Sequence, residues 1–169
     1  ENGNEVPKDG ETLGEISVQG NVVMKGYYND PEATSAAIKD GWFYSGDAAV
    51  VHPDGYLEIR DRFKDVIISG GENISSVEVE GCLLHHEAVL EVAVVGMPHE
   101  KWGEAPHAFV VLQEGRSTTE DELKLYVREN LAHFKTPQWI SFVKDLPKTA
   151  TGKVQKFVLR DGKAAISTQ

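Results

Sequence analysis

The feature that most constrains the fold is the stretch Ile59–Ile74, in which a charged segment joins two apolar runs. A cluster of charges of both signs follows Ile59, and a short β-branched run then leads to the adjacent glycines Gly70 and Gly71. A solvated, charged crossing between two buried runs is typical of a boundary between packed units. Adjacent glycines indicate a backbone with positive φ or a close approach to another group. The alternative is a surface hairpin followed by a strand–helix turn.

Length and charge limit the classes of function. The chain has 169 residues, of which 40% are hydrophobic and 26% charged, a globular composition with room for one or two domains. Its net charge of −10 argues against nucleic acid and against an anionic membrane surface as partners. The single cysteine, Cys82, cannot form a disulfide within the chain, so a reducing compartment is expected. No apolar run is long enough to span a membrane, and the polar start without methionine predicts a fragment of a longer protein.

Residues 1–63 predict a unit built mostly of antiparallel strands. The segment Glu15–Gly20 alternates polar and apolar residues, as a half-buried strand does. Asp30 followed by Pro31 predicts the start of a short helix, because aspartate caps free backbone N–H groups and proline suits the first helical position. His52–Gly55 predicts a tight turn, in which proline presets φ and glycine accepts a positive φ. Further strands are expected at Trp42–Ala48, Ala49–Val51 and Tyr56–Arg60.

Residues 64–169 predict a compact α+β domain, with a small antiparallel sheet flanked by helices. Two capping boxes, Ser75–Glu78 and Thr119–Glu122, predict helix starts, because their side chains satisfy free backbone N–H groups. The first helix is expected to bury Val77 and Leu84. The expected strands are the apolar runs Val89–Val95 and Ala105–Leu112, joined by Gly96–Gly103, and the short stretch Trp139–Val143.

Lys153 ends a segment rich in glycine and threonine, Pro147–Lys153. A full phosphate-binding loop would need a glycine five residues before Gly152, where Pro147 stands, so the segment is not that motif. Two interpretations stay open from these residues. Lys153 is either an ordinary solvated side chain or a mobile lysine that reaches anionic oxygen atoms as a point charge.

Asp47 follows Gly46 at the end of a predicted strand. An aspartate there can accept two hydroxyl hydrogen bonds, as ribose recognition requires, or it can cap a turn. The six histidines predict no protein-ligated metal, because none has a cysteine partner at metal-binding spacing. The pair His99 and Glu100 also lacks the second histidine of a zinc helix.

Together these segments resemble the C-terminal third of the acyl- and aryl-CoA ligases, which belong to the adenylate-forming (AMP-binding) superfamily. The residue sequences of the motifs are most similar to those of medium-chain and aromatic acyl-activating enzymes of plant type. The resemblance covers about residues 14–160 and rests on several motifs in one order. These motifs are Gly14–Ile16, Gly26–Thr34, Gly41–Asp47, Asp61–Asp65, Ile68–Ile74, Trp102–Glu104 and Pro147–Lys153.

The resemblance implies a role for each candidate residue. Asp47 and Arg62 would bind the ribose and nucleotide of ATP or AMP. Lys153 would be the catalytic lysine of adenylation, and Lys64 would be the hinge between two domains. The residues expected near bound CoA in the thioester step are Gly70, Gly71, Glu72, Trp102 and Glu104.

The implied parent protein is an ATP-dependent carboxylic acid–CoA ligase. Its carboxylate substrate would attack the α-phosphate of Mg-ATP to give an acyl-adenylate, from which CoA would then displace AMP. Residues 1–63 would end the large domain, and residues 64–169 would be the mobile C-terminal domain. Mg²⁺ and the acid would bind mainly in the rest of the large domain, so the fragment alone is expected to be inactive. The resemblance implies an intracellular enzyme, cytoplasmic or peroxisomal.

One departure and two alternatives accompany this interpretation. Thr136 stands where some CoA ligases carry a second base for the phosphates of CoA, which weakens the expected CoA contacts. The first alternative is a binding or interaction module without chemistry of its own. The second is an adenylation domain that loads a carrier-protein thiol. These residues do not define the acid substrate.

Overall fold

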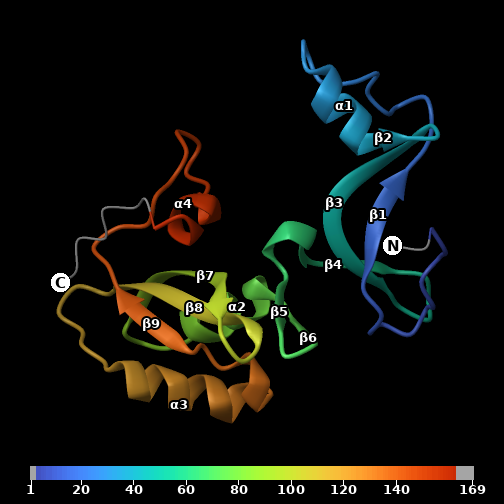
Figure 1. Cartoon of the computed structure of the whole chain (residues 1–169). Helices are drawn as coiled ribbons and strands as arrows, with labels where there is room; N and C mark the ends of the chain where they lie inside the picture. Colours follow the sequence, from blue (N-terminus) through green and yellow to red (C-terminus); the bar gives the residue numbers. More distant parts are fainter. Residues whose placement is uncertain (1–2, 163–169) are drawn as a thin grey trace. The chain divides into compact units, whose positions relative to one another are not determined.

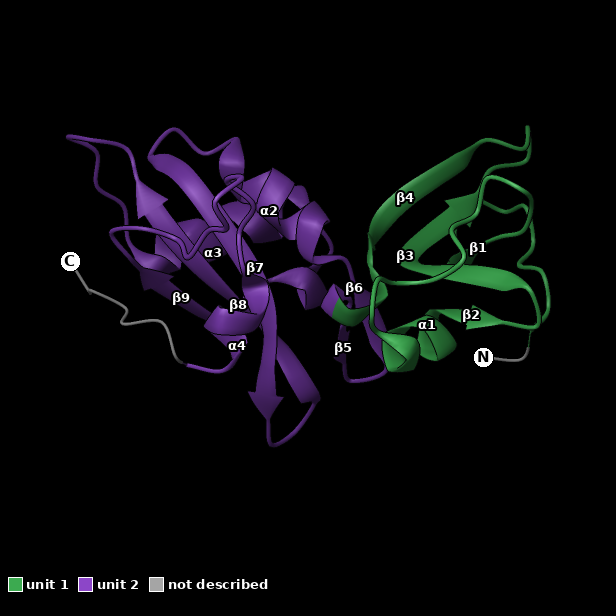
Figure 2. Cartoon of the chain, turned by 90° about the horizontal axis from the view of Figure 1, so that it is seen from above, with its two compact units in different colours: residues 1–64 green, residues 65–169 purple. Residues whose placement is uncertain are grey.

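The structure, a computed structural model, describes residues 3–162, which form two compact units (Figures 1 and 2). Unit 1 extends through Lys64, and unit 2 begins at Asp65. The division falls one residue after the boundary expected from the sequence, within the charged segment that precedes the two glycines.

Unit 1 is a four-stranded antiparallel sheet with one short helix. Its strands are β1 (Gly14–Val18), β2 (Ile38–Lys39), β3 (Trp42–Val51) and β4 (Leu57–Arg62), and its helix is α1 (Pro31–Ala37). The long strand β3 pairs with each of the other three. It continues through Ala48 and Ala49 without interruption, where the sequence predicted two separate strands.

Local sequence determines the ends of these elements. Asp30 caps α1, because its Oδ1 accepts the backbone N–H of Ala33 at 2.9 Å. The turn before β4 is closed by the Gly55 N–H, which donates to the His52 carbonyl at 2.8 Å, and Gly55 has a φ of 89°. Both predictions are confirmed.

In its described residues, 65–162, unit 2 is a five-stranded sheet with three α-helices. Its strands are β5 (Ile67–Ser69), β6 (Glu72–Ile74), β7 (Val89–His99), β8 (Gly103–Leu112) and β9 (Trp139–Phe142), and its helices are α2 (Ser76–Leu84), α3 (Glu120–Asn130) and α4 (Lys156–Arg160). The predicted α+β class is confirmed. Strand β9, however, pairs with β8 in parallel, so an antiparallel sheet describes only the other four strands. The chain between β8 and β9 passes through α3, and a parallel pair needs a crossover of that kind.

Two details of unit 2 differ from the prediction. The expected connection Gly96–Gly103 is largely strand, because β7 continues to His99 and carries Pro98 within it. Proline is tolerated there since β7 is an edge strand of the sheet. Val77 and Leu84 are exposed, and α2 instead buries Val79 and Leu83. Both pairs lie at helical spacing, so periodicity alone did not distinguish the buried face.

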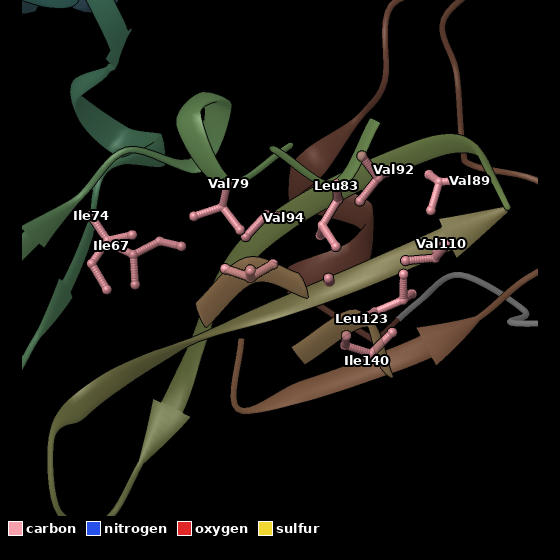
Figure 3. Close-up of a cluster of buried hydrophobic side chains, with 12 residues drawn as sticks. Ile67, Ile74, Val79, Leu83, Val89, Val92, Val94, Val110, Leu123 and Ile140 are labelled. Carbon is pink, nitrogen blue, oxygen red and sulfur yellow. The ribbon is translucent and has the colours of Figure 1, made fainter. Parts of the chain in front are cut away.

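The sheet of unit 2 is buried on both faces. Alternate residues of β7 and β8 enter two separate clusters, which explains why these runs are almost continuously apolar. The first cluster includes Ile67, Ile74, Val79, Leu83, Val92, Val94, Val110, Leu123 and Ile140, from the strands and from α2 and α3 (Figure 3). The second cluster lies under α4 and includes Ala93, Val95, Phe109, Val111, Val143, Leu146 and Leu159.

Unit 2 is therefore expected to fold as a core of its own. Buried apolar residues of unit 1 are confined to Ala48, Ala49 and Val50 among the described residues, whereas unit 2 contains both clusters. In hydrogen exchange on this chain, amides of β7 and β8 should exchange slowest, and amides of unit 1 should exchange much faster. Equal protection of the two units would contradict the prediction.

Candidate functional site

Asp47 and Arg62 form an ion pair at the edge of unit 1. They are register partners on β3 and β4, and Arg62 Nε lies 3.1 Å from Asp47 Oδ1. The positive φ of Gly46, 75°, precedes Asp47, and the Gly46 N–H is bound by the Glu15 carboxylate at 2.9 Å. Both side chains of the pair are partly exposed, at 31% for Asp47 and 42% for Arg62. The pair thus places a hydrogen-bond acceptor and a cation side by side on a partly exposed surface.

Lys64 lies between two neighbours that are each anchored to a different unit. Arg62 is fixed to β3 through Asp47, and Asp65 is buried and ion-paired with Arg160 of α4. Lys64 itself is exposed and belongs to the short 3₁₀ turn Phe63–Asp65. A backbone rotation at Lys64 would therefore leave both anchors intact.

Gly70 and Gly71 form the turn of the β5–β6 hairpin. Ser69 pairs with Glu72, and the two glycines have φ values of 60° and 90°, which fit a type I′ turn. A side chain at Gly71 would meet no other atom within 4 Å, so the glycine is needed for its backbone conformation and not for packing. Glu72 is exposed beside the turn.

The β7–β8 turn lies against this hairpin. The Gly70 N–H donates to the Trp102 carbonyl at 3.0 Å, and the Trp102 indole lies 3.5 Å from the position of a Cβ on Gly70. The Trp102 ring stacks on His99 with centroids 4.4 Å apart, and His99 also lies 5.8 Å from Trp139. This ring contact fixes the orientation of an exposed aromatic surface next to the two glycines.

Glu104 is adjacent to the same hairpin. Its Oε2 accepts the backbone N–H of Ile68 at 3.2 Å. The structure thus brings the expected thioester-step residues together at one end of unit 2. They are Gly70, Gly71, Glu72, Trp102 and Glu104.

Lys153 belongs to a small loop that is closed by its own hydrogen bonds. The Thr149 N–H donates to the Lys153 carbonyl at 2.8 Å, and the Lys153 N–H donates to Thr149 Oγ1 at 3.1 Å. Gly152 takes a φ of 84° to close the turn. The loop is anchored by Lys148, whose Nζ lies 2.7 Å from Glu91 Oε1. The ammonium of Lys153 has no carboxylate partner among residues 3–162, so it is available to an anionic ligand.

The Lys153 loop and the glycine hairpin lie at opposite ends of β7. The loop is anchored at Glu91, near the start of the strand, and the hairpin contacts the turn after His99. Eight residues of strand span roughly 25 Å. The loop and the hairpin also pack on opposite faces of the sheet. Val154, next to Lys153, packs on the second cluster, whereas Ile67 and Ile74 of the hairpin belong to the first. The Lys153 loop and the glycine hairpin are therefore well separated within unit 2.

The candidate residues line neither of two hollows found within the described residues, one in each unit. A hollow of about 610 Å³ in unit 1 lies around Tyr27 and Pro31, and one of about 360 Å³ lies between α2 and α3, around Cys82 and Tyr126. Within residues 3–162, no group of three or more His, Cys, Asp or Glu side chains is arranged to hold a metal ion. Over the same residues, no helix is long and apolar enough to cross a bilayer.

Sequence comparison identifies the class to which these features belong. Residues 78–153 match the family described as the AMP-binding enzyme C-terminal domain. The chain belongs to the adenylate-forming, AMP-binding enzymes and is homologous to their C-terminal part.

Its relatives include named CoA ligases from plants, which confirms the resemblance to plant-type acyl-activating enzymes. The peroxisomal butyrate–CoA ligase AAE11 of Arabidopsis thaliana is 56% identical over 159 residues, covering 92% of this chain and 28% of that protein. The 2-methylpropanoate–CoA ligase CCL4 of Humulus lupulus is 57% identical, covering 92% and 29%. The crystal structure of ATP-bound MatB from Rhodopseudomonas palustris is similar to this chain with a TM-score of 0.86 and 38% sequence identity. The match covers 98% of this chain and 33% of that chain. The chain spans 27% to 31% of the length of the curated relatives it matches.

Sequence reasoning missed Gly96 and Arg160. Arg160 pairs with Asp65, 95 residues earlier in the chain. Gly96 lies beside the Glu104 carboxylate, and no turn requires a glycine there because Gly96 is within β7. A glycine within a predicted strand is a known sign of close approach, and that signal could have singled out Gly96.

Proposed function

We propose that this chain is the C-terminal part of an ATP-dependent carboxylic acid–CoA ligase. The observation that carries the proposal is the separation, within unit 2, of an unpaired lysine from a glycine hairpin at the other end of β7. Two half-reactions at one centre would each need a different end of this unit. The named CoA ligases among the relatives favour this function over a non-catalytic module or a carrier-protein-loading domain.

In the proposed adenylation step, unit 2 presents Lys153. Its ammonium neutralises the charge that develops on the carboxylate and α-phosphate oxygens, which lowers the barrier to attack. Asp47 accepts hydrogen bonds from the ribose hydroxyls, and Arg62 contributes a cation beside them. The products of this step are an acyl-adenylate and pyrophosphate.

In the proposed thioester step, unit 2 turns about Lys64 and presents the other end of β7. The turn formed by Gly70 and Gly71 has no side chains, so it leaves room for the pantetheine arm of CoA. The exposed indole of Trp102 and the exposed Glu72 lie at the same end, where the Glu104 carboxylate binds the backbone of the hairpin at Ile68. The CoA thiol then attacks the mixed anhydride, and AMP leaves. Such alternation is a hinge-type domain motion.

Mg²⁺ and the acid pocket are assigned to the part of the enzyme outside this chain. The arrangement of acidic groups in residues 3–162 does not fit a metal site, so no step is drawn through a metal here. Lys135, next to Thr136, is engaged with both carboxylate oxygens of Glu78 at 2.6 Å, which supports the expectation that CoA phosphate contacts are reduced at this position. A peroxisomal location is proposed from the compartment named for the Arabidopsis relative.

The full-length enzyme tests the proposal directly. Acid-dependent exchange of pyrophosphate into ATP, followed by release of acyl-CoA and AMP, is expected with one or more members of a panel of short-chain, branched, medium-chain and aromatic acids. Exchange without transfer to CoA, but with transfer to a carrier-protein thiol, would support the carrier-loading alternative. Absence of exchange with every acid would remove the adenylation assignment.

Gly71→Leu is expected to impair the thioester step. Leucine at a φ of 90° is strained by about 1–3 kcal/mol, and its side chain enters the proposed path of the pantetheine arm. Thioester formation from preformed acyl-adenylate should fall roughly tenfold or more, while adenylation should be retained. Single-turnover assays with added acyl-adenylate and CoA measure the effect.

Gly115→Leu is the matched control for this substitution. Gly115 has a φ of 75° and no atom within 4 Å of its Cβ position, but it lies in the turn after β8. The melting temperatures of the two variants should decrease by similar amounts, and only Gly71→Leu should lose thioester activity. Normal CoA saturation and turnover in a folded Gly71→Leu enzyme would exclude Gly71 from the path of CoA.

A further inference from the structure

The glycine hairpin is attached to the rest of the sheet by very few backbone bonds. Strand β5 pairs with β8 at a single register position, Ser69 with Gly103, next to the bond from the Gly70 N–H to the Trp102 carbonyl. In a hairpin closed by two residues, Ser69 and Glu72 exchange backbone bonds, so Ile68 directs its N–H away from β6. That N–H needs a partner from β8.

Glu104 supplies this partner with its side chain. Its Oε2 accepts the Ile68 N–H at 3.2 Å, although Glu104 is itself a residue of β8 paired with Pro98 of β7. The carboxylate therefore replaces a missing backbone bond between β5 and β8. A charged acceptor makes such a bond stronger than a neutral one would be.

Gly96 provides the space for this carboxylate. A Cβ on Gly96 would lie 2.8 Å from Glu104 Oε2 and 3.2 Å from Glu104 Cδ. Gly96 is in β7, and its φ is not in the positive region, so the backbone does not require glycine here. The same Cβ would lie 3.3 Å from Ile67 Cγ2, so the absence of a side chain makes room for the Glu104 carboxylate first and for Ile67 of β5 second.

We propose that Glu104 is a positioning residue for the thioester step. Its carboxylate lies beside Gly96 and holds β5 in register with β8. This keeps the turn of Gly70 and Gly71 beside Trp102. Glu104 then acts through the hairpin and not by contact with CoA. The proposal rests on the proposed function of the hairpin.

The competing role for Glu104 is direct chemistry, in which its negative charge acts on CoA or on the thiol proton. Glutamine separates the two roles, because its side-chain carbonyl can still accept the Ile68 N–H but carries no charge. A positioning role predicts that Glu104→Gln, which keeps a weaker neutral bond to the Ile68 N–H, retains most of the thioester activity that Glu104→Ala loses. A role for the charge predicts equal losses.

The test uses the full-length enzyme with three variants: Glu104→Ala, Glu104→Gln and Gly96→Ala. In Glu104→Ala, thioester formation from preformed acyl-adenylate should fall about tenfold, as expected for one charge-assisted hydrogen bond, with adenylation unchanged. Backbone amides of residues 66–74 should exchange hydrogen faster. Gly96→Ala should reproduce both effects, because its methyl group displaces the carboxylate and crowds Ile67 of β5. Glu104→Gln should lose much less than Glu104→Ala in both measurements.

Gly81→Ala is the control for the added methyl group, since a Cβ at Gly81 of α2 meets no atom within 4 Å. It should leave both half-reactions and the exchange of residues 66–74 unchanged. Equal loss in Glu104→Gln and Glu104→Ala, or unchanged exchange in Gly96→Ala and Glu104→Ala, overturns the proposal. If Glu104→Ala does not fold, Gly96→Ala and Glu104→Gln still decide it. An enzyme that forms no acyl-CoA contradicts the proposed function instead, and the exchange measurement continues to test the role of Glu104.

Discussion

Replacing Lys153 by alanine in the full-length enzyme is expected to slow adenylation by about 10²–10³-fold, the usual loss when one preorganised donor to a developing charge is removed. The ammonium of Lys153 has no ion-pair partner within the described chain, so its removal should cost little stability. Thioester formation from preformed acyl-adenylate should be largely retained, because the hairpin that serves it lies at the other end of β7. Acid-dependent pyrophosphate exchange and a single-turnover thioester assay measure the two steps separately.

Lys148→Ala is the matched control. Lys148 stands on the same loop, but its ammonium is bound by Glu91 at 2.7 Å and both side chains are 38% exposed. An exposed ion pair of this kind contributes little to stability, and the loop remains closed by the bonds between Thr149 and Lys153, so adenylation should change by less than about tenfold. Equal loss of both half-reactions in Lys153→Ala would show that the two ends of unit 2 are not used separately.

Lys64→Pro is expected to trap one orientation of the two units without removing an active-site group. Proline fixes φ near −65° and would push Phe63 toward extended conformations. Arg62 and Asp65 are anchored within different units, so a backbone change at Lys64 lies between the two anchors and should alter the path of the chain from one unit to the other. Pyrophosphate exchange should survive at a substantial level, and thioester formation should fall much further.

Lys64→Ala distinguishes backbone freedom from charge. Alanine removes the ammonium group and keeps the backbone free, so both half-reactions should stay close to wild type. If alanine and proline impair the thioester step equally, the charge of Lys64 is the cause and the hinge assignment fails. Wild-type behaviour of both variants would make Lys64 an ordinary solvated side chain.

Features that depend on a few neighbouring residues could be predicted from the sequence. The Thr119 side chain binds the Glu122 N–H and the Glu122 carboxylate binds the Thr119 N–H, as the capping box predicted, since the partners are three residues apart. The same holds for Asp30 at α1 and for the turn at Gly55. Local geometry needs no knowledge of the rest of the fold.

Features that depend on distant partners could not be predicted in this way. The parallel pairing of β9 and the burial of Val79 in place of Val77 are decided by packing of α2 and α3 on the sheet. At the candidate site, the sequence identified Glu104 by resemblance but not its bond to Ile68, 36 residues away. No local pattern specifies which backbone N–H a carboxylate will reach.

The ion pair between Asp65 and Arg160 has a consequence for the synthesis of the protein. The two residues are 95 positions apart, and Leu159 beside Arg160 completes the second cluster. At about 5–20 residues per second, the ribosome needs roughly 5–20 s to add Arg160 after Asp65. The first cluster includes Ile140, so at that rate only about 1–4 s separate its last residue from Arg160. The small helix α4 is therefore the last element of the described part of unit 2 to be made, and the buried Asp65 gains its cation only when α4 joins the second cluster.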